Sequence, residues 1–154
     1  MATWGEFSAA VPDLASAGAR LLTQFGPGLA FLSTIRSDGG PRLHPICPVI
    51  FGGDLWAFII TASPKCSDLR RDGRFALHSF PPEDVDDEFA IRGVAHEAAD
   101  LRPGTETWAG IQQATTASVG RPDEIPFRLH IDSVMLATYE ARGVFPPAYS
   151  VWQA

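Results

Sequence analysis

The sequence predicts a mainly β protein, a small six-stranded antiparallel barrel with a few short helices. Six apolar runs of strand length are separated by turn-forming stretches such as SDGG and GGD. Only three segments have the character of helices. Closure into a barrel removes the exposed edges that short strands would otherwise present to solvent, although a split sandwich would show the same pattern.

The amino-terminal part begins with an amphipathic helix over residues 12–25. Leu14, Leu21 and Leu22 lie on one face of this helix at helical spacing, and Gly26 ends it. Three apolar runs then predict the strands of an antiparallel meander, over 28–36, 41–51 and 55–61.

Two prolines interrupt the middle strand of this meander. Pro45 and Pro48 have no backbone N–H and cannot donate to a neighbouring strand. We therefore expect an irregular or edge strand, either a plain edge or one where a ligand takes the place of a neighbouring chain.

The carboxy-terminal part continues with both types of element. Ser63 and Pro64 are typical of a helix start, and they predict a short helix over 64–72 that ends at Gly73. Strands are expected over 74–80, 87–100 and 127–140, with a further helix over 104–119. The last strand does not alternate cleanly, and a β-bulge near Ser133 would restore its alternation.

Length and composition exclude several classes of protein. The 154 residues fit one domain, 1–154. A net charge of −6 and only 19% charged residues argue against binding to nucleic acid or to anionic membranes. No apolar run approaches the roughly 20 residues of a membrane span, and no secretory leader is recognisable, so we expect a cytoplasmic protein.

The reactive side chains show no motif for metal binding or hydrolysis. Cys47 and Cys66 lack the CxxC spacing and histidine partners of a zinc site, so we expect free thiols and no metal. The four histidines have no ligand spacing, and no G-x-S-x-G elbow is present. They are His44, His78, His96 and His130. The sequence therefore identifies no catalytic residue.

The only lysine in the chain, Lys65, lies at the predicted start of the helix over 64–72, whereas arginine occurs eleven times. A helix start exposes unpaired backbone N–H groups and the positive end of the helix dipole. Hydroxyls at Thr61 and Ser63 would add donors, and the ammonium would add a point charge. The pattern is typical of a phosphate site, with a solvated surface lysine as the alternative.

The order of these parts resembles a known family. GPRLHPICPVIFGGDLWAFIITASPKCSDLRRDGRFALHSF, followed by EFAIRGVAHEAAD, looks like the flavin-binding split β-barrel family related to pyridoxamine 5′-phosphate oxidase. The resemblance covers about residues 25–100, and FRLHIDSVMLATYEA with YSVW is similar to the family's closing strand and tail. It implies a six-stranded antiparallel split β-barrel that forms a homodimer and binds FMN, a deazaflavin cofactor or haem in grooves between subunits.

The resemblance implies roles for the residues around the helix start. Lys65 and Ser63 would hold the cofactor phosphate, and Thr61 would lie beside the ribityl chain or the phosphate. Two positions depart from the family's pattern. Pro64 stands where many members have an arginine, and Cys66 stands where a small or basic residue is common. These departures would weaken the phosphate clamp or suit another cofactor.

The resemblance also implies roles on the proline-interrupted strand. His44, Pro45 and Ile46 would line the isoalloxazine ring through backbone and side-chain contacts. Arg42 would be a second partner of the phosphate or the ring.

Three functions are compatible with these features. The favoured one is an FMN-binding oxidoreductase that acts on a small molecule as a homodimer, since a flavin does the redox chemistry with few protein acids or bases. A deazaflavin-dependent reductase is the second, with Arg70, Arg71 and Arg74 forming a wider basic groove. The third is a non-enzymatic dimer that binds FMN or haem.

Overall fold

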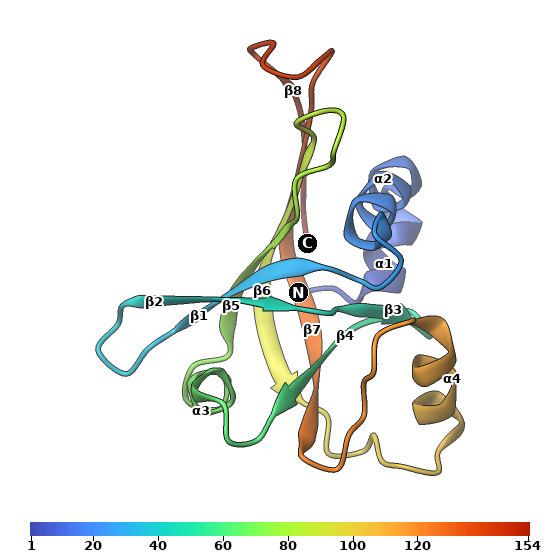
Figure 1. Ribbon diagram of the computed structural model, residues 1–154, viewed down its shortest axis with the longest axis vertical. Helices are drawn as coiled ribbons and strands as arrows, with labels where there is room; N and C mark the ends of the chain where they lie inside the picture. Colours follow the sequence, from blue (N-terminus) through green and yellow to red (C-terminus); the bar gives the residue numbers. More distant parts are fainter.

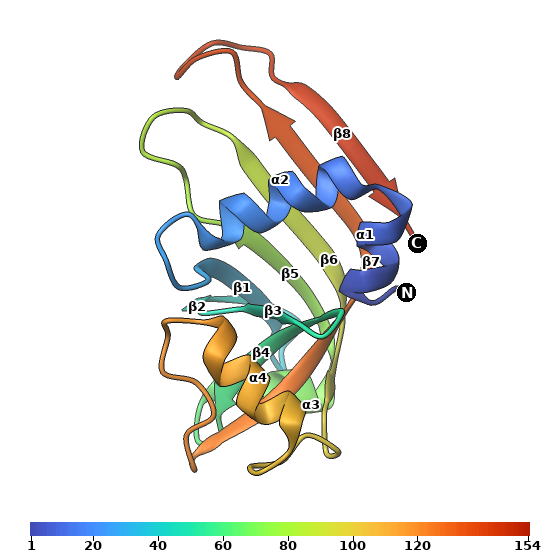
Figure 2. The same ribbon diagram turned by 90° about the vertical axis from the view of Figure 1, so that its right-hand side faces the viewer.

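In the computed structural model, residues 1–154 form one eight-stranded antiparallel sheet and four helices. The sheet is strongly curled, and the helices pack around it, as Figure 1 and Figure 2 show. The strands are β1 (Ala30–Ile35), β2 (Pro41–Ile46), β3 (Val49–Phe51), β4 (Asp54–Ile60), β5 (Arg74–Ser79), β6 (Glu88–Glu97), β7 (Glu124–Thr138) and β8 (Ala148–Gln153). The helices are α1 (Trp4–Ala10), α2 (Pro12–Thr23), α3 (Pro64–Arg71) and α4 (Glu106–Ala114). No helix is long and apolar enough to cross a membrane.

The prediction of a mainly β antiparallel fold is confirmed, but there are eight strands rather than six. The run over 41–51 forms two strands, β2 and β3, and the patterns predict no strand at β8. Five of the six β8 residues are exposed, so this strand lacks the apolar alternation that sequence patterns detect. All three predicted helices are present as α2, α3 and a shorter α4.

Helix α1 is an addition to the predicted elements. Thr3 caps it, and Glu6 completes a capping box by accepting from the Thr3 backbone N–H. Trp4 and Phe7 bury the apolar side of this seven-residue helix against the sheet. The T-x-x-E signature was present in the sequence, but the helix is too short to show a helical period.

The predicted three-stranded meander is wrong. Two separate hairpins, β1–β2 and β3–β4, are found instead, and the strand order β2-β1-β5-β6-β7-β4-β3 places β2 and β3 at opposite edges of the sheet. The break lies at Cys47 and Pro48, where proline supplies no N–H for further pairing. β2 and β3 are therefore both edge strands, as the prolines predicted, and Cys47 and Pro48 connect them along the chain.

The predicted bulge in the last strand is confirmed. Arg92 pairs with Ser133 but Gly93 pairs with Ile131, so Asp132 is the extra residue of β7. Before the bulge β7 also pairs with β4, and after it with β8. The bend at the bulge lets this one strand serve both the closed part of the sheet and the arm that projects from it in Figure 1.

The two faces of the sheet are covered differently. The main core lies on the inner face, where α1 and α2 pack on β6 and β7, and where Cys66 and Leu69 of α3 are buried. A second cluster around Trp56 and Trp108 joins α4 to β3 and β4. The opposite face carries a row of directly paired residues from β2 to β8 that no helix covers: Pro45, Phe31, His78, Ala90, Met135 and Val151.

Gly28 provides a test of the corner at which the sheet edges meet. A Cβ on Gly28 would lie 1.9 Å from the Pro48 carbonyl oxygen, which is backbone and cannot rotate away. We expect Gly28→Ala to lower the free energy of unfolding by about 1 to 3 kcal/mol in urea denaturation. Gly5→Ala is the control, because its Cβ would approach no atom closer than 3.4 Å. Equal stabilities of the two variants would contradict the tight corner.

Candidate functional site

Helix α3 begins where the lysine pattern predicted, after the turn that follows β4. Ser63 is its N-cap in an extended conformation, and Pro64 occupies the first turn. The Ser63 hydroxyl makes no capping hydrogen bond, and the Cys66 amide donates to the Ser63 carbonyl at 2.9 Å, so the Lys65 amide is left without a partner in the first turn. The Thr61 hydroxyl and amide both donate to the Asp123 carbonyl, at 2.9 and 2.8 Å. Thr61 therefore fixes the turn to the start of β7.

Lys65 is half-buried, and its ammonium makes no hydrogen bond or ion pair within the chain. Burial lowers the pKa of Lys65, and the carboxylate of Glu124 partly offsets this effect. A partly desolvated ammonium without a partner is unfavourable in the ligand-free chain. Lys65 is thus not the fully solvated surface lysine of the alternative interpretation.

The arginines that follow Lys65 are all paired with carboxylates. Their nitrogen–oxygen distances are 2.8 Å for Arg70–Glu97, 3.2 Å for Arg71–Asp68 and 2.7 Å for Arg74–Asp72. Arg71 also donates to the Ile35 carbonyl oxygen on β1. In the stretch from β4 to β5, Lys65 is the one cation that the chain itself leaves unpaired.

Strand β2 divides the predicted ring-binding residues between two faces. His44 and Ile46 lie opposite Leu32 and Ala30 of β1 and face inward with them. Pro45 points the other way, onto the uncovered face of the sheet. Ile46 is part of the main core. One flat ligand cannot touch all three side chains, although the backbone of this edge strand remains accessible along its length.

His44 has an unsatisfied nitrogen beside the lysine. Its Nε2 atom is buried and has no hydrogen-bond partner. Burial lowers the pKa of His44, and the positive charges of Lys65 and Arg42 lower it further, so the imidazole is neutral at physiological pH. A buried polar atom without a partner is rare in folded proteins, and it marks a position where a ligand atom would be stabilised.

A buried carboxylate, Asp68, links α3 to the neighbouring strands. Asp68 accepts hydrogen bonds from Thr34 Oγ1 at 3.0 Å, Arg42 Nε at 2.7 Å and Arg71 Nη2 at 3.2 Å. Burial raises the pKa of Asp68, but hydrogen bonds from these three side chains outweigh it and hold the pKa below its ordinary value. Arg42 was expected at a phosphate or ring, and in the structure its Nε belongs to Asp68 while its Nη groups have no partner within the chain.

Asp68 is the residue of this site that sequence reasoning missed. It lies one helical turn after Lys65, between Cys66 and Leu69, which both face the core. That position was a signal, because an acidic residue on the buried side of a short helix needs a partner. Nothing in the sequence indicated that the partners would come from β1 and β2.

The remaining titratable groups form no second site of the expected kinds. No group of three or more His, Cys, Asp or Glu side chains is placed to hold a metal ion. His96 and His130 pack edge to face with ring centroids 5.2 Å apart, and His78 lies 3.8 Å from Glu88. Cys47 is half-buried, and burial followed by the charge of Glu124 raises the pKa of its thiol.

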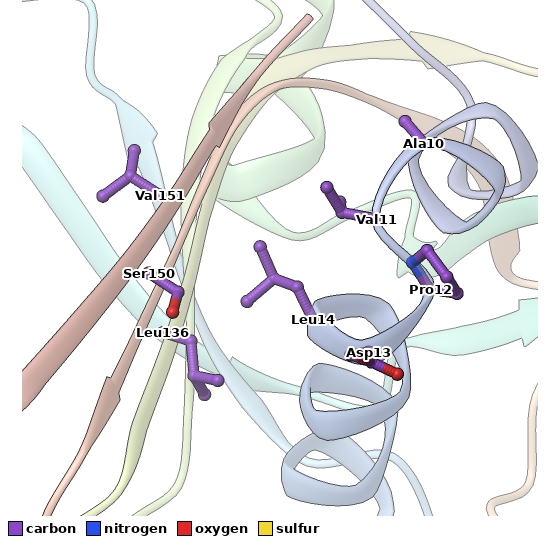
Figure 3. Close-up of a pocket in the computed structure, with 8 residues that line it drawn as sticks. All are labelled: Ala10, Val11, Pro12, Asp13, Leu14, Leu136, Ser150 and Val151. Atoms are coloured by element: carbon purple, nitrogen blue, oxygen red, sulfur yellow. The ribbon is translucent and has the colours of Figure 1, made fainter.

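A cavity of about 520 Å³ lies away from Lys65, between the α1–α2 junction and the β7–β8 arm. Figure 3 shows Val11, Leu14, Leu136 and Val151 around it. The residues predicted at the site do not line this cavity. We therefore assign the candidate site from the unpaired groups at α3 and β2 rather than from cavity size.

Several proteins of known structure share the overall fold of this chain. No protein-family model and no curated protein matches the sequence. A heme binding protein from Mycobacterium smegmatis is similar in structure, with a TM-score of 0.64 and 16% identity over 90% of this chain and 57% of its own. A Clostridium acetobutylicum protein of the pyridoxinephosphate oxidase family has a TM-score of 0.62 and 12% identity, with 92% and 94% covered. An F420 reductase has a TM-score of 0.56 and 16% identity, with 75% and 94% covered.

The fold is that of the pyridoxamine 5′-phosphate oxidase-like split barrels. This confirms the fold that the sequence resemblance implied. Split barrels with this fold include proteins named for heme binding and for F420 reduction, so the fold is compatible with more than one cofactor. The fold alone therefore assigns no cofactor to this chain.

The pKa of Asp68 leads to a test of the cluster by acid unfolding. A carboxyl whose pKa is lowered on folding adds stability above its unfolded pKa, and this contribution is lost as pH falls through the folded pKa. The ordinary value is 3.8. We expect the wild type to be more stable than Asp68→Asn near neutral pH, with a difference that shrinks as pH falls below that value. Urea denaturation over a pH series measures this difference, and a constant difference would contradict the lowered pKa.

Proposed function

We propose that this split barrel is an FMN-binding oxidoreductase acting on a small molecule. The observation that carries the proposal is the half-buried, unpaired ammonium of Lys65 at the start of α3. The free hydroxyl of Ser63 and the buried, unpartnered Nε2 of His44 support it from the same region. These groups suit a ligand that combines a phosphate with ring nitrogen and oxygen atoms.

The residues present fit a phosphorylated flavin. A phosphate at the start of α3 would accept hydrogen bonds from the Lys65 ammonium, the Ser63 hydroxyl and the Lys65 backbone N–H at the positive end of the helix dipole. The ring would lie along the edge strand β2, where His44 offers a neutral imidazole. The flavin supplies hydride or electron transfer when bound, and these side chains bind and orient it.

The alternatives differ in the charge and the ligand atom that they require. A deazaflavin cofactor with a longer anionic tail would need several free cations, and the pairing of Arg70, Arg71 and Arg74 with carboxylates disfavours it. Haem is the second candidate because the unpartnered Nε2 of His44 could ligate iron. An absorbance spectrum of the purified protein distinguishes a flavin from a deazaflavin or a Soret band.

Replacing Lys65 tests the phosphate site directly. Lys65→Ala removes a charge-assisted hydrogen bond, which corresponds to about 1.5 to 3 kcal/mol and a loss of roughly ten- to hundredfold in FMN affinity. Lys65→Arg should keep much of the affinity, because a guanidinium also binds phosphate. Titration of FMN into the apoproteins, followed by flavin fluorescence quenching, gives the dissociation constants.

Two comparisons complete this test. Arg102→Ala removes an exposed cation that has no partner and lies outside the site, and it should leave FMN affinity unchanged. The stability of the ligand-free Lys65→Ala variant should not fall, because the ammonium has no partner to lose. Equal FMN affinities of wild type and Lys65→Ala would overturn the proposed site.

We further propose that the chain is a homodimer that uses the uncovered face of the sheet. Leu43 of β2 and Val151 of β8 are 65% and 63% exposed at its two ends. The paired row between them includes Phe31 and Met135, which a solvated sheet face would replace with polar residues. A two-fold partner would cover this face and border the outer side of Pro45.

The dimer can be tested by charge substitution on this face. Wild type should sediment at twice the 16.6 kDa chain mass at micromolar concentration. Val151→Lys should shift it to the monomer, because the face would have to bury an unpaired ammonium. Val144→Lys is the matched control, since Val144 is exposed but lies outside the row. A monomeric wild type, or a dimeric Val151→Lys, would refute the assigned face.

A further inference from the structure

We infer that Asp68 is a positioning residue that holds the phosphate half of the site at a fixed distance from the ring half. The inference rests on the proposed function, which assigns the phosphate to the start of α3 and the ring to β2. Asp68 would not touch the cofactor. It would act through the residues that it anchors.

The first support is the set of elements that meet at this one carboxylate. Its three donors come from three different elements, Thr34 on β1, Arg42 on β2 and Arg71 on α3 itself. The Asp68 side chain is only 4% exposed, so little water competes for these hydrogen bonds. Arg71 also donates to the backbone of β1 at Ile35. Helix α3 is thereby attached to the β1–β2 hairpin through charged, directional contacts.

The second support is where Asp68 lies relative to the candidate ligand groups. Lys65 is three residues earlier on the same helix, and His44 is two residues after Arg42 on the same face of β2. Asp68 is thus one helical turn from Lys65, and its partner Arg42 is two residues from His44 along β2. FMN would have to span both groups at once, so its affinity depends on the spacing between α3 and β2.

Two other roles of Asp68 are compatible with the same hydrogen bonds. Asp68 could merely stabilise the fold, or it could neutralise Arg42 and Arg71 and so keep them away from a phosphate. The three roles predict different changes in the contribution of the phosphate to binding. That contribution is the ratio of the dissociation constants of riboflavin, which lacks the phosphate, and FMN.

The experiment measures this ratio by fluorescence quenching in wild type and Asp68→Asn. If Asp68 positions α3, the ratio should fall roughly tenfold or more, because FMN can no longer contact both halves while riboflavin needs only one. In the Lys65→Ala background, Asp68→Asn should change the ratio little, because the phosphate contact is already lost. Asp72→Asn is the matched control, since Asp72 pairs with Arg74 at 2.7 Å near the end of α3 remote from Lys65. It should leave the ratio unchanged.

The outcomes separate the inference from the proposal on which it rests. A wild-type ratio near one would overturn the proposed phosphate site and the role of Asp68 together. A large wild-type ratio that Asp68→Asn leaves unchanged would refute only the positioning role, and a ratio that rises would show that Asp68 masks arginines. Should Asp68→Asn not fold, Thr34→Val removes one donor at nearly constant shape and should lower the ratio in the same direction, and no change would count against the inference.

Discussion

The missing N–H of Pro48 is the constraint on which the rest of this structure depends. The chain cannot continue its pairing beyond β2, so it turns and enters the sheet again as β3 at the opposite edge. Gly28 allows the close approach of the Pro48 carbonyl that this corner needs. As a result β2 stays an edge strand, with backbone groups free on one side. The inner face of that edge lies against α3, which places Arg42 and His44 beside the helix that carries Lys65.

The electrostatics of the site follow from this arrangement. The positive charges of Arg70 and Arg71 on α3 and of Arg42 on β2 would repel one another, and acidic residues of the same region offset this repulsion. Asp68 satisfies Arg42 and Arg71, while Asp72 and Glu97 pair with the arginines farther along. Besides the Nη groups of Arg42, what remains is one ammonium and one neutral imidazole, both partly desolvated and both without partners. A dianionic group with adjacent ring atoms complements that pair better than a polyanion does.

Sequence patterns predicted most of the sheet and brought out some residues of the candidate site, for reasons that individual residues make clear. Strands with regular alternation and helices with strong start signals, such as the Ser63–Pro64 start of α3, were correct because local chemistry determines them. The exposed β8 was not predicted because its stability comes from pairing with β7. The short α1 was not predicted because its stability comes from the burial of Trp4 and Phe7. Lys65 stood out as the only lysine, whereas Asp68 gains its role from strands 26 to 34 residues away in the chain, a relation that no local pattern contains.

The candidate site contains one residue whose hydrogen bonds are made within the chain and two residues whose polar groups have no partner there. Asp68 has all its partners within the chain, so it contributes to the stability of the ligand-free protein and makes the spacing of α3 and β2 rigid. Lys65 and His44 have none, so they reduce stability slightly until a ligand supplies them. A ligand at the proposed site would therefore recover a cost already present in the folded chain, and at a hundred times its dissociation constant it would add about 2.7 kcal/mol to stability. Because the rigid and the unsatisfied groups are different residues, affinity for the ligand can change at Lys65 without loss of the fold that presents it.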